Sequence, residues 1–286
     1  MAYGWKMYYG TWRPTTPPHC PPDITCIKDG SIWHAGGVCA RWTTDFDCKQ
    51  ETDFWYCIKD TEFDIGKLNS KKRYYIKKGI ANFEVKRINP ADYLDDLYAV
   101  TNKALKTYDD YSAPQDRTEF VNEIRERDDL IFFGAFRENQ LCGYIKIKDW
   151  GSYVDFMSMK ADPEFEKKQI NAAMVNALCE KYAERLRGGG VYICDGMRNI
   201  NHRTNFQDYL VRNFMFRKAY CRLHMAYPKR VGILVRILYP IREMIFLMNS
   251  KWKIRLFKKV SVILQCEEIA RRTNRGAVDV VESNID

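Results

Sequence analysis

The chain has 286 residues, of which 46% are hydrophobic and 29% are charged, and its formal net charge is +9. This length and apolar content provide ample material for a core. No N-terminal apolar run follows basic residues, so we expect no secretory signal, and no apolar run reaches the roughly 20 residues of a membrane-spanning helix. The positive charge suits three kinds of partner, namely nucleic acid, anionic lipid and phosphorylated small molecules.

Residues 1–80 are predicted to form an N-terminal extension rich in aromatic residues and proline. The stretch 8–22 lacks periodicity and is expected to be extended, whereas 33–42 and 53–60 have the character of short strands. The ten cysteines are scattered, and Cys142, Cys179, Cys194 and Cys221 fall within or beside expected strands or a helix. This pattern favours reduced, buried thiols, as in a cytoplasm, over disulfides or a zinc site.

Residues 81–228 alternate between expected strands and helices, and this order predicts an α/β (α+β) domain with a mixed, twisted sheet flanked by helices. Residues 90–106 carry apolar side chains at three- and four-residue spacing, the period of an amphipathic helix. Thr118 is placed to cap a second helix. The other expected elements are that helix at 118–127 and strands at 82–88, 130–136, 141–148 and 154–159.

One strand, loop and helix in this domain give the first functional signal. A polar loop at 160–166 follows the strand at 154–159, and a helix is expected to open at Lys167. Free N–H groups and the positive dipole end make a helix start an anion site, and Ala172 and Ala173 would let a ligand approach the backbone. The run predicts a pyrophosphate site, and an ordinary strand–helix unit is the alternative interpretation.

A second unit of similar design follows. An expected strand at 191–194 ends at Asp195 and Gly196, and a polar loop then leads to an expected helix at 206–214. Another strand is expected at 221–227. This second unit strengthens the functional interpretation of the first.

These units resemble the GCN5-related N-acetyltransferases (GNAT). The family's acyl-coenzyme A motif, Arg/Gln-x-x-Gly-x-Gly/Ala, would correspond to Lys168-x-x-Asn171-x-Ala173, and Met215-Phe216 stands where the family has Gly-Phe. The order of elements over 82–227 follows that of the family. The sequence segments at 53–60, 70–79 and 192–209 resemble segments of GNAT-like acyltransferases that are associated with bacterial surface-glycan genes. The basic segment at 70–73 also faintly resembles a segment of the peptidoglycan-bridge (FemAB-like) transferases.

The resemblance implies a GNAT-like fold and an N-acyltransferase that uses acetyl-CoA or another acyl-CoA, needs no metal, and acts on an amine of a sugar or glycan precursor. Such chemistry needs a base for the amine, a donor for the oxyanion and an acid for the thiolate. The implied catalytic residues are Asp195, His202 and Tyr209. The implied cofactor-binding residues are Phe156, Met157, Met159, Lys167, Lys168, Gln169, Asn171, Ala172, Ala173 and Asn205, and the implied substrate-binding residues are Arg198, Asn199 and Asn201.

Several of these residues also have a plainer interpretation. Asp195 can serve the turn before Gly196, and Asn205 can cap the following helix. His202 can be an ordinary surface histidine. Tyr209 stands six residues before Met215, so matching the family's acid tyrosine would require an inserted turn.

Residues 229–286 are predicted to form a basic, amphipathic helical tail. The segment 229–259 either packs on the catalytic domain or lies on an anionic membrane surface, which would make the protein cytoplasmic and peripheral to the inner face of the membrane. Two other functions stay open. One is an aminoacyl-tRNA-dependent transferase for cell-wall precursors, because tRNA binding needs only a basic surface and a fitting shape. The other is a non-catalytic, degenerate GNAT binding module.

Overall fold

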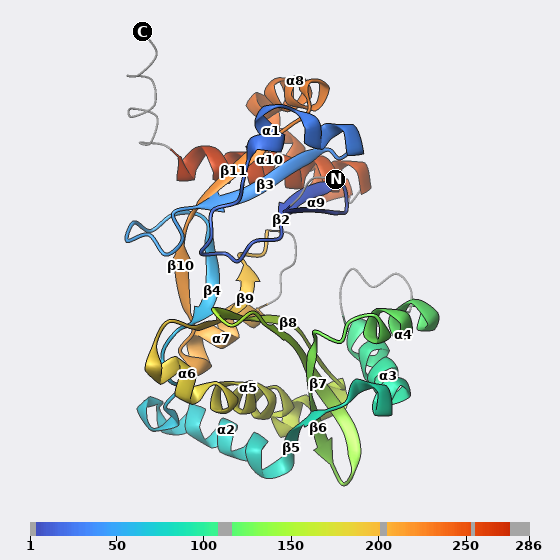
Figure 1. Cartoon of the computed structure of the whole chain (residues 1–286), viewed down its shortest axis with the longest axis vertical. Helices are drawn as coiled ribbons and strands as arrows, with labels where there is room; N and C mark the ends of the chain where they lie inside the picture. The colour runs from blue at the N-terminus through green and yellow to red at the C-terminus, as the bar shows by residue number, and fades with distance from the viewer. Residues whose placement is uncertain (1–3, 108–115, 201–204, 253–254, 275–286) are drawn as a thin grey trace. The chain divides into compact units, whose positions relative to one another are not determined.

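The computed structural model describes the backbone of residues 4–107, 116–200, 205–252 and 255–274, and the side chains of these residues except 249–257. The chain divides into two compact units (Figure 1). We call Cys57–Gly196 with Asn205–Arg217 the central unit, and Met1–Tyr56, Met197–Thr204 and Lys218–Asp286 the terminal unit. The units interleave along the chain, so their limits do not coincide with the sequence-based boundaries at 80 and 228.

Within the described residues the strands form a four-stranded sheet of order β1-β2-β3-β11 and a seven-stranded sheet of order β10-β4-β9-β8-β7-β6-β5. The division between the units falls inside β4, β9 and β10. The strands are β1 (Trp5–Tyr8), β2 (Thr11–Pro14), β3 (Cys39–Thr44), β4 (Trp55–Lys59), β5 (Glu84–Ile88), β6 (Ile131–Arg137), β7 (Gln140–Asp149), β8 (Tyr153–Ala161), β9 (Tyr192–Met197), β10 (Arg217–Tyr220) and β11 (Arg222–Ala226).

The helices lie between these strands and after the last of them. The α-helices are α1 (Thr25–Lys28), α2 (Ser70–Asn82), α3 (Leu94–Leu105), α4 (Arg117–Arg125), α5 (Ile170–Lys181), α6 (Ala183–Gly188), α7 (Phe206–Phe214), α8 (Lys229–Leu238), α9 (Arg242–Trp252) and α10 (Arg255–Thr273). The 3₁₀ turns are η1 (Ser31–Ala35), η2 (Ile65–Lys67), η3 (Pro90–Tyr93), η4 (Pro163–Lys168) and η5 (Tyr239–Ile241).

In the central unit, helices cover both faces of the sheet formed by β5 to β8 (Figure 1). These four strands are antiparallel neighbours, and β9 then joins β8 in parallel. The residues of β6 from Phe132 to Phe136 are all buried. A continuous buried run of this kind is typical of a strand covered on both faces. The mixed, twisted sheet with flanking helices is the predicted α/β architecture.

Helices α2 and α5 of the central unit approach each other closely at Gly79. A Cβ atom at this position would lie 2.5 Å from the backbone oxygen of Gln169 and 3.0 Å from the backbone nitrogen of Ala173. Only glycine allows this approach, because backbone atoms cannot move aside as a flexible side chain can. Ala172 and Ala173 are each 2% exposed. Small residues on both helices therefore bring α2 directly over the first turn of α5.

The terminal unit joins segments that are far apart in the sequence. Strand β3 pairs with β11 in an antiparallel register that runs from Ala40 opposite Ala226 to Thr44 opposite Arg222. On its other edge β3 pairs in parallel with β2. Helix α10 packs against β11, where the Thr273 hydroxyl accepts a hydrogen bond from the Leu223 backbone N–H at 3.1 Å.

Several expected elements match the structure and others need correction. The β6–β7 hairpin is confirmed, and α7 has the predicted bounds. The strand expected at 33–42 is wrong in its first half, because η1 and the left-handed glycines Gly36 and Gly37 precede β3. The N-cap of α4 is Asp116 rather than Thr118, since its side chain accepts a hydrogen bond from the Glu119 backbone N–H at 2.9 Å.

Candidate functional site

Strands β8 and β9 of the central unit separate from each other after a short parallel contact. They pair at three positions, Tyr153 with Tyr192, Val154 with Ile193 and Asp155 with Cys194. Strand β8 continues to Ala161 and β9 continues past Cys194, but the two share no further pair within the described residues. The edge of β8 that faces β9 is therefore left without a strand partner from Phe156 onward.

A β-bulge lies at the same point on β8. On the β7 side, Ile147 pairs with Phe156 and Lys146 pairs with Ser158, so Met157 has no residue opposite it. The Met157 side chain is 39% exposed. A bulge bends its strand and redirects the local peptide groups, and bulges are common beside active sites. The bend and the separation from β9 together open the sheet at 156–159.

Asp155 is the last residue of β8 to pair with β9. Burial raises the pKa of its carboxyl to about 6, and the positive charges of Lys148 and Arg127 oppose this rise. These two cations are also engaged elsewhere, because Lys148 Nζ and Arg127 Nε each lie 2.7 Å from an oxygen of Asp129. Their shared contact with Asp129 explains why they compensate the buried Asp155 charge only in part.

Asp195 follows Cys194 and is the first residue of β9 beyond the paired segment. Burial raises the pKa of its carboxyl to about 7, a hydrogen bond from the Gln207 side chain lowers it, and the negative charge of Asp155 raises it further. Side chains alternate along a strand, so Asp195 lies on the opposite face of the sheet from Asp155. A carboxyl with this pKa is partly ionised at neutral pH and can accept or donate a proton.

Helix α7 covers the face on which Asp195 lies. The ring of Phe206 packs edge-to-face against Phe156 at 5.8 Å between centroids, and it stacks on Tyr209 at 6.0 Å. Gln207 Nε2 donates a hydrogen bond to the Asp195 backbone oxygen at 3.4 Å. Burial raises the pKa of the Tyr209 phenol above its usual value, so this hydroxyl stays protonated at neutral pH. Asp195 and Tyr209 thus border one aromatic cluster.

Helix α7 ends at Met215, the position where the family resemblance expects glycine. Met215 has φ 58° and is the left-handed C-cap of the helix. Its conformation is the one that a glycine at this place would supply, and it is reached here at some backbone strain.

The predicted pyrophosphate loop is packed more tightly than the sequence indicates. Residues 163–168 form the 3₁₀ turn η4, and α5 begins at Ile170 rather than at Lys167. The Ala173 N–H already bonds the Gln169 backbone oxygen at 3.1 Å. Because Ala172 and Ala173 are buried under α2, their small side chains serve helix packing. A phosphate cradle here would have to use the residues that precede them.

Those preceding residues are accessible to different degrees. Lys167 is exposed, while Lys168 is half-buried, with its Nζ atom 5.2 Å from the centroid of the Phe165 ring. Gln169 has φ 67° and joins η4 to α5. Asn171 is half-buried, and its Oδ1 atom has no hydrogen-bond partner among the described residues. Met159 of β8, another predicted donor-binding residue, is also half-buried.

The remaining predicted residues, namely the catalytic His202, the cofactor-binding Asn205 and the substrate-binding Arg198, Asn199 and Asn201, have different surroundings. His202 and Asn201 lie outside the described residues. Asn205, in the central unit, is exposed at the start of α7, and its side chain makes no capping hydrogen bond. Arg198 and Asn199 belong to the terminal unit. Arg198 lines a hollow of about 630 Å³ there with Trp55, Lys218 and Arg272, and its guanidinium donates to the Asp53 backbone oxygen.

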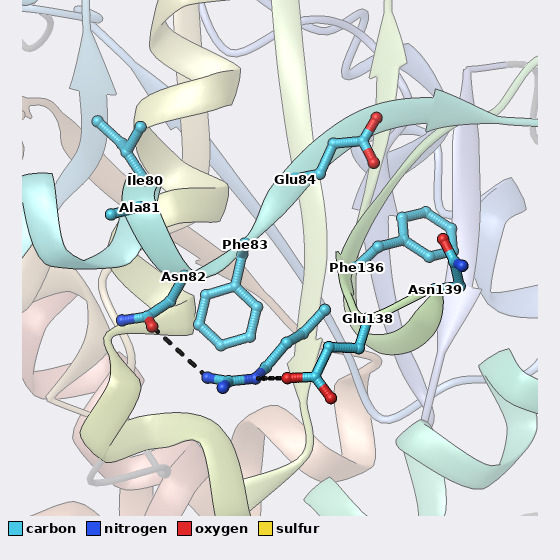
Figure 2. A pocket seen from close by; sticks show the side chains of 9 residues that line it. Ile80, Ala81, Asn82, Phe83, Glu84, Phe136, Glu138 and Asn139 are labelled. Atoms are coloured by element: carbon cyan, nitrogen blue, oxygen red, sulfur yellow. Dashed lines mark hydrogen bonds and ion pairs between the residues drawn. The ribbon is translucent and has the colours of Figure 1, made fainter.

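A second hollow, of about 390 Å³, lies at the end of α2 in the central unit (Figure 2). The Arg137 guanidinium donates hydrogen bonds to Asn82 Oδ1 at 3.5 Å and to Glu138 Oε1 at 3.2 Å. The lining also includes Glu84, so it holds one cation and two carboxylates. A pyrophosphate would be repelled by this balance of charge, and we do not assign the donor to this hollow.

No three His, Cys, Asp or Glu side chains cluster as metal ligands in the part of the chain that the structure describes. The ten cysteines are free thiols, and those at 142, 179, 194 and 221 are buried as expected. The candidate site therefore consists of the β8–β9 opening, Asp195 with its neighbour Asp155, and Tyr209. Asp195 and Tyr209 were predicted from the sequence and stay predictions, whereas Asp155 was not predicted, and its only signal in the sequence is a carboxylate within the alternating strand at 154–159.

No protein-family model matches the chain, and no curated protein matches it in sequence. Among solved structures, it is similar to the PaiA N-acetyltransferase from Thermoplasma acidophilum in complex with coenzyme A, with 21% identity, 36% of this chain and 73% of that chain covered, and a TM-score of 0.29. A GCN5-related N-acetyltransferase-like protein from Streptococcus suis matches with 12% identity and a TM-score of 0.36, and the match covers 70% of this chain and 67% of that chain. The C-terminal DUF2156 domain of a proposed lysylphosphatidylglycerol synthetase from Agrobacterium fabrum matches with 8% identity and a TM-score of 0.48, and the match covers 81% of this chain and 82% of that chain.

Proposed function

We propose that this protein is an acyl-CoA-dependent N-acyltransferase that transfers an acyl group, in the first instance acetyl, to an amine of a sugar or other glycan precursor. The observation that carries the proposal is the opening of β8 and β9 beside Asp195. The sequence resemblance to GNAT acyltransferases supplies the donor class. The resemblance of residues 53–60 and 70–79 to surface-glycan acyltransferases supplies the acceptor class.

The residues at the opening fit an extended, thioester-bearing donor. The free edge of β8 from Phe156 offers peptide groups to a chain that lies along it, in the manner of an added strand. The exposed Met157 side chain provides apolar contact, while Phe156, which is 3% exposed, anchors this part of the strand against Phe206. Lys167 and Lys168 at the end of η4 provide positive charge for the phosphates of coenzyme A.

The chemistry follows from the two proton-bearing groups. The Asp195 carboxylate takes a proton from the attacking ammonium, so that a neutral amine forms the new C–N bond. Peptide N–H groups at the Met157 bulge stabilise the oxyanion that forms at the thioester carbonyl. Once the C–N bond has formed, the nitrogen releases its second proton to solvent. As the C–S bond breaks, Tyr209 donates its proton to the thiolate and recovers one from solvent, and Asp195 returns its proton to solvent. The bound acyl-CoA supplies the activated acyl group.

The test is steady-state release of free thiol from acetyl-CoA, with amino sugars as acceptors, together with calorimetric binding of coenzyme A. The proposal expects saturable binding and amine-dependent thiol release. Binding without transfer to any amine favours a non-catalytic GNAT module. Absence of binding, together with transfer from an aminoacyl-tRNA, favours the cell-wall precursor transferase. Either result contradicts the proposed function.

A further inference from the structure

Helices α8 and α9 of the terminal unit expose a continuous apolar stripe to solvent. Six large apolar side chains between residues 233 and 247 are 44% to 63% exposed. They recur at helical spacing through the short turn η5, so they share one side of the helical segment. The members of the stripe are Ile233, Leu234, Ile237, Ile241, Met244 and Leu247.

The stripe is not the face that folds these helices onto the unit. The opposite face carries Val235 and Ile245, which are buried and form a core cluster with Leu264 of α10. Residues 233–247 are therefore apolar on two sides, one already packed and one open. An exposed, contiguous apolar surface of this kind on a folded unit marks an interaction site.

The charge around the stripe indicates which partner it fits. Residues 229–259 contain nine lysines and arginines against one glutamate, a net +8 that nearly equals the +9 of the whole chain. Lys229, Arg230 and Arg236 are exposed on α8, the same helix that presents Ile233 and Ile237. Apolar side chains flanked by long basic ones fit a surface of lipid tails beneath anionic headgroups.

The lengths of the helices indicate how they would meet a bilayer. α8 has 10 residues and α9 has 11. No helix in the described ranges combines the length and the apolar character required to cross a membrane. Short helices that are apolar on one side and basic around it lie in the plane of the interface.

We propose that α8 and α9 dock on an anionic lipid bilayer, with the stripe at the boundary between headgroups and acyl chains and with Lys229, Arg230 and Arg236 against lipid phosphates. The docking surface consists entirely of residues of the terminal unit, and the proposal does not depend on acyl transfer. It adds a location to the proposed function, because an enzyme held at this surface meets acceptors that are themselves carried in the membrane.

The experiment is flotation of the full chain with vesicles of phosphatidylcholine alone or of phosphatidylcholine mixed with phosphatidylglycerol. We expect binding to the mixed vesicles only, and weaker binding as salt is raised, because salt screens exposed charges. The double variant Lys229→Glu/Arg230→Glu should bind at least roughly tenfold more weakly, since each basic residue near an anionic surface contributes to binding. Lys71→Glu/Lys77→Glu, which reverses two exposed lysines of α2 in the central unit, should bind as the unaltered chain does.

The apolar stripe is tested in the same assay with Ile237→Asn. Its matched control is Ile80→Asn, which changes an isoleucine on α2 that is 46% exposed. The proposal expects weaker flotation for Ile237→Asn and no change for Ile80→Asn, with circular dichroism showing that both variants are folded. No binding of the full chain to mixed vesicles, or equal binding of Ile237→Asn and the unaltered chain, overturns the proposal. Loss of a dimer in Ile237→Asn without any vesicle binding would assign the stripe to self-association instead.

Discussion

The first turn of α5 and the opening between β8 and β9 were both candidate ligand sites, and the structure treats them differently. At α5 the small residues Ala172 and Ala173 are buried beneath α2, where Gly79 permits close contact of the two backbones. At the opening, β8 loses its partner after Asp155, and Asp195 keeps a carboxyl whose pKa burial raises to about 7. Small residues near a helix start thus serve packing as readily as ligand binding. A half-buried carboxylate beside an unpaired strand edge is the more specific sign of chemistry.

The largest expected effect comes from removing the Asp195 carboxylate. Asp195→Asn should reduce turnover by roughly 10²–10⁴-fold, the range for loss of a general base, and should leave coenzyme A affinity nearly unchanged. Activity of the unaltered enzyme should rise with pH through about 7, as Asp195 becomes ionised. The pH profile of thiol release measures both. Full activity of the folded Asn variant would remove Asp195 from the chemistry.

Asp155→Asn is the matched variant, because Asp155 is the other carboxyl at this opening whose pKa is raised. Its negative charge raises the pKa of Asp195, so its removal should move the acid limb of the profile to lower pH and leave the plateau rate similar. A plateau loss as large as that of Asp195→Asn would instead make Asp155 the base.

The Asp195 carboxyl should also make the stability of the fold depend on pH. The pKa of Asp195 is raised on folding from 3.8 to about 7, so folding favours its protonated form. Its contribution to stability is complete below about pH 4 and is lost as pH rises through 7. Between pH 5 and 8 the free energy of unfolding should fall more for the unaltered protein than for Asp195→Asn, by up to about 2.5 kcal/mol. Urea unfolding at several pH values measures this difference, and parallel curves would contradict the burial of Asp195.

Gly79→Ala should destabilise the central unit by about 1–2 kcal/mol. The added Cβ meets backbone atoms of Gln169 and Ala173, and this overpacking outweighs the better helix propensity of alanine. Gly188→Ala in α6 is the control, since a Cβ there meets no atom within 4 Å. That variant should be stabilised by at most about 1 kcal/mol. Chemical denaturation measures the free energy of unfolding of both variants. Equal changes would show that α2 and α5 are not closely packed at Gly79.

A smaller effect is expected at the end of η4. Lys168→Glu should weaken coenzyme A binding roughly 3- to 10-fold, because it reverses a charge close to a helix N-terminus. Lys181→Glu, at the far end of α5, should leave the affinity unchanged. Calorimetric titration compares the two, and equal affinities would place the phosphates away from η4.

Local patterns in the sequence were sufficient for some elements and insufficient for others. The β6–β7 hairpin and α7 follow from alternation and from helical spacing within short windows. The two units could not be foreseen, because β3 pairs with β11 across roughly 180 residues of sequence, and no local pattern encodes such a pairing. Gly36 and Gly37 were a visible turn signal within the strand expected at 33–42, and they mark where that prediction failed.

The site was predictable to a similar extent. A polar residue at a strand end pointed to Asp195, but its pKa depends on burial by α7 and on Asp155, and neither is visible in the sequence. Asp155 lies within a strand of alternating polar and apolar residues. Only the register between β8 and β9 shows that it is the last residue of β8 to pair with β9. The burial of Ala172 and Ala173 depends on Gly79, more than 90 residues earlier in the chain.

The central claim is that a donor lies along the free edge of β8 beside Asp195. Hydrogen exchange of the backbone amides, with and without saturating acetyl-CoA, tests it most directly. The account predicts slowed exchange at residues 156–159 on adding acetyl-CoA, while the buried first turn of α5 at 170–173 is already protected and does not change. Unaltered exchange at 156–159 in a protein that binds acetyl-CoA, with protection appearing only elsewhere, would contradict it.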